Sequence, residues 1–356
     1  MLTLVALASG CAPAAPTPAA TITPIDTAPF SARVGSFKGE AAVWIGDPGE
    51  RPIFALNPDA PVLAASLYKL AVALHVEALV DRGKLAYADP VEITDEDITV
   101  DGSNELPGTV LSVDEALEQM IAHSDNGAAL ALLRQLGASN VNATLAAVGI
   151  SGFHVAIDRD DDHAVSARAL ATFFSLLADE RLVSKAASAR LRERLERTQI
   201  NDRLPARLPE GTAVAHKTGN LIGFTHDAGI IRTPNGARVV VVLTWEGSEG
   251  DAIELIADLG RVAYDLPPAP RAQGAAMPAP LAGAVEAVGN SVLGSPLPWL
   301  AGLSGAAGLL YVLVRARRHR GRAQRLRRRQ GPLTVWSPDR TGRATPARAP
   351  RQQRRR

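Results

Sequence analysis

Cysteine is almost absent from this sequence of 356 residues, because Cys11 is the only one. A single cysteine excludes an intramolecular disulfide and argues against a cysteine-based zinc site. Lysine is also scarce: of 38 basic residues only five are lysine, namely Lys38, Lys69, Lys84, Lys185 and Lys217. Since arginine supplies the ordinary basic charge here, a retained lysine indicates a position where a group able to lose its proton is useful.

The net charge of +1 conceals an uneven distribution. From Arg315 to the C-terminus there are 16 arginines and one aspartate, a net of +15, so the remaining 314 residues carry about −14 (+1 minus +15). A basic tail on an acidic body predicts two environments along one chain. We expect the tail to meet anionic lipid, and we expect no nucleic-acid partner.

The N-terminus predicts export. Residues 1–11 form an apolar run that ends in Ala8-Ser-Gly-Cys11, which resembles a bacterial lipobox with Cys11 as the lipidated residue. Residues 12–30, rich in Ala, Pro and Thr, are typical of a tether.

The C-terminal part predicts a membrane anchor. Residues 267–290 are a Pro- and Ala-rich linker, and residues 291–314 carry no charge and are long enough to span a bilayer. The arginines that begin at Arg315 favour the cytoplasmic side. We therefore expect a single-pass protein of the cell membrane, with its folded domain outside and residues 315–356 as a cytoplasmic tail.

Residues 31–266 predict one α+β domain. Alternating segments at 41–45 and 52–56 predict a hairpin, and strand patterns return at 212–217, 224–232 and 237–245. Between them, spacings of three and four predict helices over 66–82, 112–122, 125–136, 139–148, 166–179 and 184–197, with a closing helix over 251–264. Strands at both ends predict one antiparallel sheet of about five strands packed with helices, plus a helical subdomain.

Three short motifs carry the chemistry, in the order Ser66-Leu-Tyr-Lys69, Ser124-Asp-Asn126 and Lys217-Thr-Gly219. A spacing of three puts Ser66 and Lys69 on one helical face, so Lys69 can serve as the base that activates the Ser66 nucleophile. Burial and the charge of Lys217 would lower the pKa of Lys69 enough for this role.

The other two motifs supply the surroundings of the nucleophile. Ser124 lies at a predicted break between helices and could relay a proton to a leaving nitrogen, while Asn126 offers an amide to the substrate. Lys217 and Thr218, at the end of a predicted strand, could bind a carboxylate, and Gly219 lets another backbone approach closely.

Taken together, the motifs resemble the superfamily of class A β-lactamases and penicillin-binding proteins, over about residues 36 to 265. The resemblance implies that fold and a serine hydrolase that needs no cofactor or metal. It also implies an oxyanion hole made by the backbone N–H groups of Ser66 and Asn220. We expect a monomer that acts on a β-lactam or a D-Ala-D-Ala peptide.

One departure from the superfamily concerns hydrolysis of the acyl-enzyme. Class A β-lactamases carry a Glu-x-x-Leu-Asn motif, whose Glu activates the deacylating water, and no such sequence lies between Asn126 and Lys217. Asp158, Asp160, Asp161 or Asp162 could replace it, although such a charge run is more often a solvated turn. His123, His216 and His226 flank the motifs without the spacing of a metal site, and Asp227 reads as a structural partner.

Three functions therefore remain open. The first is a membrane-anchored β-lactamase of the class A type that hydrolyses the β-lactam amide through an acyl-enzyme on Ser66. The second is a D-Ala-D-Ala carboxypeptidase, a penicillin-binding protein that acts on peptidoglycan. The third is a non-hydrolytic sensor that is acylated by β-lactams.

Overall fold

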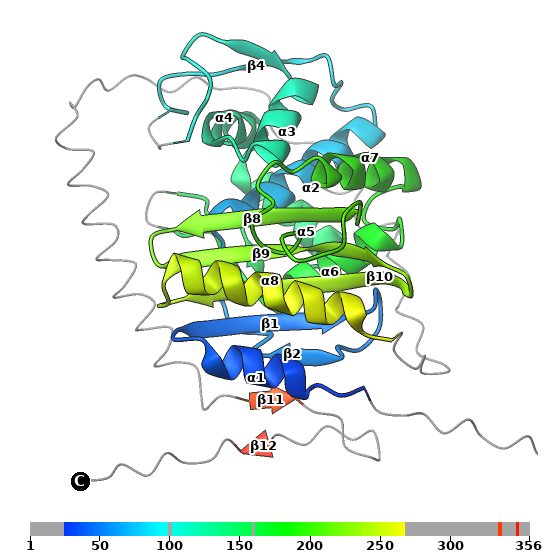
Figure 1. Ribbon diagram of the computed structural model, residues 1–356. Helices are drawn as coiled ribbons and strands as arrows, with labels where there is room; N and C mark the ends of the chain where they lie inside the picture. Colours follow the sequence, from blue (N-terminus) through cyan, green and yellow to red (C-terminus); the bar gives the residue numbers. More distant parts are fainter. Residues whose placement is uncertain (1–24, 99–101, 159–160, 268–333, 337–346, 349–356) are drawn as a thin grey trace, which may run out of the picture.

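One antiparallel sheet joins the two ends of the domain (Figure 1). The computed structural model describes residues 25–98, 102–158, 161–267, 334–336 and 347–348. The sheet has the order β12-β11-β2-β1-β10-β9-β8. Its strands are β1 (Glu40–Gly46), β2 (Phe54–Leu56), β8 (Val214–Leu221), β9 (Phe224–Thr233), β10 (Gly236–Trp245), β11 (Thr334–Trp336) and β12 (Ala347–Arg348). The predicted sheet of five strands from both ends of the domain is confirmed, with β11 and β12 added beyond β2.

Helices cover both faces of this sheet. In Figure 1, α1 (Ala28–Ser36) and α8 (Glu249–Asp265) lie in front of it, and α2 (Tyr68–Asp81), α5 (Ala138–Ala147) and α6 (Ala167–Ala178) lie behind. The run Val239–Leu243 on β10 is buried on both sides: Val240 and Val242 join one apolar core, and Val239, Val241 and Leu243 join the other. A strand covered on both faces needs a continuous apolar run rather than alternation.

The remaining helices are α3 (Val113–Ala122), α4 (Asn126–Leu136) and α7 (Lys185–Glu196), with a short 3-10 turn at Ala65–Leu67. All seven predicted helices are present, with bounds within two residues of the predicted ones. Polar residues begin several of them: Ser112 forms a capping box with Glu115, and Asp125, Ser166, Ser184 and Ser248 each accept a backbone N–H three residues on.

The structure differs from the predictions at one helix and at five short strands. Helix α1 begins at Ala28, inside the stretch predicted as a tether, because Phe30 is fully buried and stacks on Phe54. The additional strands are β3 (Val62–Leu63), β4 (Pro90–Glu92), β5 (Val110–Ser112), β6 (Phe153–His154) and β7 (Ala164–Val165). Strands of two or three residues are too short to show a period in the sequence.

Most of the predicted membrane and export features lie outside the described residues. These are the segment 1–11 with Cys11, most of the tether, the linker after Pro267 and the apolar stretch 291–314. Within the part of the chain that is described, no helix has both the length and the apolar character of a bilayer span. From the tail, β11 pairs antiparallel with β2, with Val335 opposite Leu56.

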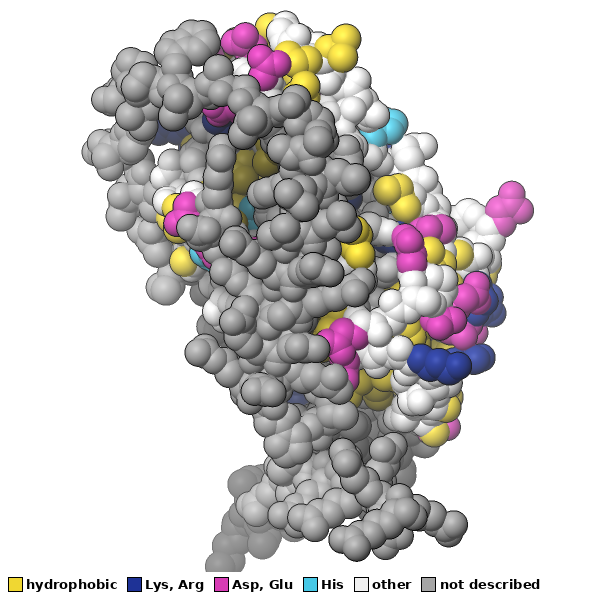
Figure 2. Space-filling model, turned by 90° about the vertical axis from the view of Figure 1, so that its left-hand side faces the viewer, with side chains coloured by type: hydrophobic (Ala, Val, Ile, Leu, Met, Phe, Trp, Pro, Cys, Tyr) yellow, Lys and Arg dark blue, Asp and Glu magenta, His cyan; other side chains and the backbone are white. Residues whose placement is uncertain are grey.

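Acidic side chains are spread over the face shown in Figure 2, with small groups of hydrophobic side chains between them. This agrees with the negative charge calculated for the body of the chain. The large hydrophobic side chains that are exposed among the described residues are Leu106, Val110, Ile157, Leu221 and Ile222.

Candidate active site

Ser66 lies in the 3-10 turn Ala65–Leu67, directly before helix α2. Ala65 has a φ of +47°, a strained value for a residue with a side chain, and strain of this kind clusters at functional sites. A hydrogen bond fixes the start of this turn, because Ala64 donates its N–H to the carbonyl of His163 at 2.8 Å. Ser66 is half-buried, between buried neighbours on both sides.

Strand β8 lies against this turn and forms the edge of the sheet. A Cβ added at Gly219 would come within 3.2 Å of the Ala64 carbonyl, the Ala65 Cβ and the Leu67 side chain. Glycine lets β8 approach the serine turn this closely, whereas a side chain at this position would require the neighbouring atoms to shift by a few tenths of an ångström. The strand continues to Leu221 instead of ending at Lys217, because its pairing with β9 extends to Phe224. Lys217 and Thr218 are therefore buried within the strand.

Ser124 occupies the connection between α3 and α4, as predicted. Its φ of +59° is in the left-handed region, a second strained position in the same site. The next residue fixes this connection, since the buried Asp125 carboxylate accepts the N–H of Ala128 at 2.7 Å and that of Asn104 at 2.5 Å. The result is a rigid turn that presents the Ser124 hydroxyl to both lysines.

Lys69 and Lys217 meet at Ser124. The Lys69 Nζ donates to the Ser124 carbonyl at 2.5 Å and to Asn126 Oδ1 at 2.6 Å, and it lies 3.3 Å from Ser124 Oγ. The Lys217 Nζ donates to Ser124 Oγ at 2.8 Å and to the Thr218 carbonyl at 3.1 Å. Among the described residues, none of the hydrogen bonds of Lys69 goes to Ser66 Oγ, which differs from the contact expected from their spacing.

The pKa values of both lysines are depressed. Burial lowers the pKa of Lys69 well below its ordinary value, and the charge of Lys217 lowers it further, against the opposing effect of Asp125. Burial lowers the pKa of Lys217 to about 7, although the carboxylate of Asp227 opposes this. A neutral Lys69 has two N–H donors and one lone pair. The two donors match the Ser124 carbonyl and Asn126 Oδ1, so the lone pair remains as an acceptor for a proton.

The remaining predicted binding residues line the same region. Asn126 begins α4 and touches Lys69, and Thr218 follows Lys217 on β8. Asn220 is exposed one residue beyond Gly219, and its side chain donates to Glu249 at 2.6 Å. The structure thus brings the three motifs together, from positions up to 151 residues apart in sequence (Ser66 to Lys217, 217 minus 66).

The acidic run that could serve deacylation lies in the loop between β6 and β7. The Asp161 carboxylate is 2.5 Å from His154 Nε2 and accepts the backbone N–H groups of Ile157 and Asp162. This pairing with His154 holds the pKa of Asp161 below its ordinary value, although burial opposes it. Asp158 and Asp162 are described and have partners of their own, whereas Asp160 lies outside the described residues.

The same loop covers the helix of the nucleophile. The ring of His163 stacks on Tyr68 with centroids 4.0 Å apart. Its Nδ1 accepts the N–H of Ala156 at 2.9 Å, so in the neutral ring Nε2 carries the proton and donates. His163 in this state has no free lone pair with which to accept a proton from water.

The sequence model of the β-lactamase enzyme family matches residues 28–266, which is two thirds of the chain. The chain belongs to this family. The β-lactamase VEB-1 of Pseudomonas aeruginosa is 27% identical over 250 residues, covering 63% of this chain and 84% of that protein. The extended-spectrum β-lactamase PER-1 of the same species is 26% identical over 249 residues, covering 63% of this chain and 80% of that protein.

Solved structures agree with this family assignment. A β-lactamase from Sphaerobacter thermophilus superposes with a TM-score of 0.63 at 26% identity, covering 67% of this chain and 96% of its own. PBP-A superposes with a TM-score of 0.61, covering 68% of this chain and 98% of its own, and its 24% identity shows the fold alone. These structures share the α+β fold that the sequence predicts for residues 31–266.

Several buried residues behind the site were given no role from the sequence. Arg203 is 2% exposed and donates to the carbonyl of His226, and its charge opposes the ammonium form of Lys217. His226 donates from Nε2 to the Leu63 carbonyl and accepts the Thr244 N–H at Nδ1, and burial lowers its pKa to about 4. This neutral histidine ties β9 to the segment before Ser66. The only sequence signal for His226 was that histidine is scarce, with seven in the chain, and Arg203 had no comparable signal.

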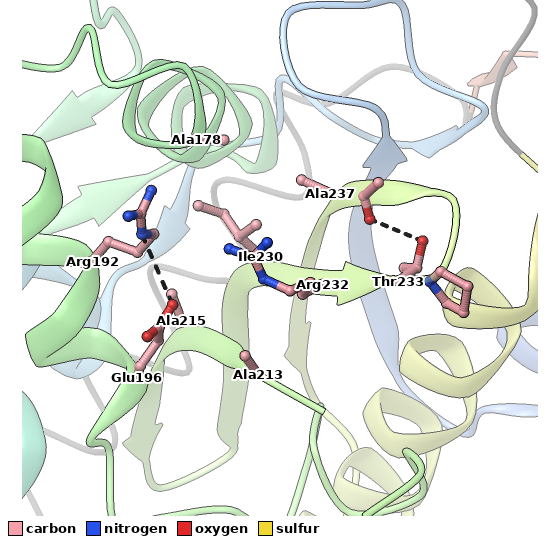
Figure 3. A pocket seen from close by; sticks show the side chains of 11 residues that line it. Ala178, Arg192, Glu196, Ala213, Ala215, Ile230, Arg232, Thr233 and Ala237 are labelled. Atoms are coloured by element: carbon pink, nitrogen blue, oxygen red, sulfur yellow. Dashed lines mark hydrogen bonds and ion pairs between the residues drawn. The ribbon is translucent and has the colours of Figure 1, made fainter. Parts of the chain in front are cut away.

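A cavity of about 450 Å³ is lined by Ala213 and Ala215, at the start of β8, and by residues of β9, β10, α6 and α7 (Figure 3). Its floor is made of small and apolar side chains such as Ala215 and Ile230, and Arg192 and Glu196 line one wall. The ion pair of Arg192 with Glu196 (3.9 Å), supported by a second one with Glu180 (3.5 Å), closes that wall. No residue of the three motifs lines this cavity.

Proposed function

We propose that this protein is a serine hydrolase that opens β-lactams by forming an acyl-enzyme on Ser66. The contact of both lysines with the Ser124 hydroxyl carries the proposal, because it supplies a base, a proton relay and a cation in one buried cluster. A serine hydroxyl is a weak nucleophile until a neighbouring base takes its proton. Lys69 lies one helical turn after Ser66, and burial lowers its pKa well below the ordinary value, which suits it to take this proton.

In the proposed acylation, the Ser66 Oγ attacks the lactam carbonyl while its proton passes to Lys69. The C–N bond then breaks, and the Ser124 hydroxyl gives its proton to the leaving nitrogen and is reprotonated from the lysine pair. The backbone N–H groups of Ser66 and Asn220 would stabilise the oxyanion, as the family resemblance implies. Lys217 and Thr218 would bind the substrate carboxylate.

A second candidate is supported by the loop between β6 and β7. Asp161 is already committed to His154 and two backbone N–H groups, and His163 has no free acceptor. The sequence has no Glu-x-x-Leu-Asn motif between Asn126 and Lys217, and of the described loop residues Asp161 and His163 are engaged in this way. We therefore expect a long-lived acyl-enzyme unless Asp158, Asp160 or Asp162 activates the water. A D-Ala-D-Ala peptidase or a β-lactam sensor would share the acylation chemistry and this slow release.

A fluorescent penicillin tests both candidates. The purified full chain should become covalently labelled, and Ser66→Ala should abolish labelling, while Ser36→Ala on the exposed face of α1 serves as the matched control. Absence of labelling, or labelling that persists in Ser66→Ala, would refute the serine mechanism. Release of the label within seconds supports a β-lactamase, and persistent label followed by cleavage of a D-Ala-D-Ala peptide supports the peptidase.

For localisation, the proposal is a domain outside the cell membrane that is anchored through residues 291–314. The uncharged stretch followed by 16 arginines supports this. Such a crossing excludes the pairing of β11 with β2 within one chain, because it would put the two strands on opposite sides of the bilayer. Labelling of a cysteine introduced at Thr334 with a membrane-impermeant reagent in intact cells decides between the crossing and the pairing. The unmodified chain, which carries Cys11 alone, gives the background, and a cytoplasmic Thr334 position adds no label until lysis.

A further inference from the structure

A buried histidine lies directly behind the catalytic lysine of β8. His216 precedes Lys217, its side chain is 1% exposed, and the Asp227 side chain beside it is fully buried. Its Nδ1 lies 2.9 and 3.0 Å from the two oxygens of the Asp227 carboxylate. Its Nε2 lies 3.1 Å from Asn201 Oδ1.

The orientation of Asn201 decides what its contact with His216 means. The Asn201 Nδ2 donates to the Thr198 carbonyl at 2.9 Å, so Oδ1, an acceptor, faces the ring. His216 Nε2 must therefore donate. Because Nδ1 faces a carboxylate on its other side, the ring has an acceptor at each nitrogen. An imidazole with protons on both nitrogens, a cation, satisfies both contacts.

The Asp227 carboxylate has a further hydrogen-bond donor besides His216. Its Oδ2 accepts the Leu204 N–H at 3.1 Å, and the cation Arg203 is buried close by. His226, on the same strand, is the contrasting case, since its Nδ1 accepts a backbone N–H and its ring stays neutral. The two buried histidines of this sheet therefore differ in the groups that face their ring nitrogens.

The fold makes specific room for His216. Gly229 lies opposite it on β9, and a Cβ there would come within 2.5 Å of the His216 Cβ. The segment Thr198–Leu204 closes over the ring, with the Thr198 hydroxyl donating to the His216 carbonyl at 2.8 Å. The same segment reaches the Ser124 turn, because Gln199 donates its N–H to the carbonyl of Ala122.

We propose that His216 is a positioning residue: as a buried imidazolium clamped between Asp227 and Asn201, it locks β8 to the segment Thr198–Leu204 and so fixes Lys217 on Ser124. It touches no substrate and acts through Lys217. The imidazolium also offsets the negative field of Asp227, which otherwise favours the ammonium form of Lys217. The expected effect of His216 on the acylation rate rests on the proposed function. The buried ion pair of His216 with Asp227 does not depend on that function.

The first experiment is spectroscopic and independent of activity. The full chain is labelled with ¹⁵N-histidine, and the ring signals of His216 are assigned by their loss in His216→Asn. At neutral pH we expect the paired nitrogen shifts of an imidazolium, and in Asp227→Asn the split shifts of a neutral ring. A neutral ring in the unmodified protein, with the proton on Asp227 instead, would overturn the inference whether or not Ser66 is acylated.

The second experiment measures acylation of the folded fraction by a fluorescent penicillin. In Asp227→Asn we expect the acylation rate constant to fall by about tenfold or more, with a smaller change in the dissociation constant, because misplacement rather than lost binding is the cause. His75→Asn is the matched control, since it removes another buried histidine that bonds only Thr144 in the described structure.

A purely structural role for His216 predicts a different outcome. Asp227→Asn and His75→Asn would then both lose stability, while acylation per folded molecule and its pH profile stayed unchanged, and this result would refute the positioning role. Failure of the unmodified chain to react with penicillin refutes the proposed function instead, and the nitrogen shifts of His216 still test the buried ion pair.

Discussion

Lys69 and Lys217 share the hydroxyl of Ser124: the two ammonium nitrogens lie 3.3 and 2.8 Å from the same Oγ. Two like charges in one buried cluster oppose each other, so at least one of them loses its proton readily. The lysines reach this hydroxyl from α2 and from β8, and Asp125 fixes the turn that carries it.

Replacing Lys217 with methionine should stabilise the protein while abolishing acylation. The folded pKa of Lys217 is about 7, below its ordinary value of 10.5. Between these values the unfolded chain binds a proton that the folded chain has lost, so the free energy of unfolding of the natural protein rises with pH. Urea unfolding at pH 6 and pH 9 should show a smaller rise in Lys217→Met. A variant less stable than the natural protein at pH 6 would contradict this.

The charge and the capping role of Asp125 can be separated. Asp125→Ala loses the N-cap of α4 and leaves the Asn104 N–H without its acceptor, so unfolding should become easier by about 2 kcal/mol. Asp125→Asn keeps a capping oxygen but removes the charge that raises the pKa of Lys69. Its main effect should be a shift of the acid limb of acylation to lower pH. Denaturant unfolding and stopped-flow labelling measure the two effects.

Gly219→Ala should slow acylation more than it affects stability. The added methyl meets the Ala64 carbonyl and the Leu67 side chain at 3.2 Å and pushes β8 away from the serine turn. A displacement of a few tenths of an ångström at the reacting groups should lower the rate about tenfold or more. Gly250→Ala on α8 is the control, since its methyl meets nothing within 4 Å. Equal acylation rates in the two variants would contradict this prediction, because they would show that the serine turn accommodates the methyl group without displacing the reacting groups.

Asp161→Asn should leave the release of a penicilloyl label unchanged within about twofold, because its carboxylate organises the loop and is not free to act as a general base. Asp158→Asn and Asp162→Asn are measured in parallel by the half-life of the labelled protein. A slowing of about a hundredfold in any one of them would identify the deacylating base and favour the β-lactamase over the peptidase.

The sequence by itself determined the class of fold and named the candidate members of the site. Helices of ten or more residues and paired strands have periods that survive without tertiary information, so seven helices and five strands could be predicted. The short strands β3 and β7, which hold the serine turn, have no period to detect. The three motifs named Ser66, Lys69, Ser124 and Lys217 because their residue types suit one chemistry.

Only the tertiary structure decided which of these groups touch. Spacing along one helix placed Lys69 beside Ser66, yet its hydrogen bonds go to Ser124 and Asn126, 55 and 57 residues away. The clamp of His216 between Asp227 and Asn201 likewise depends on three separate segments packing together. Local sequence fixes backbone periodicity, whereas the partner and the proton of a buried polar group depend on which acceptors the rest of the chain brings to it.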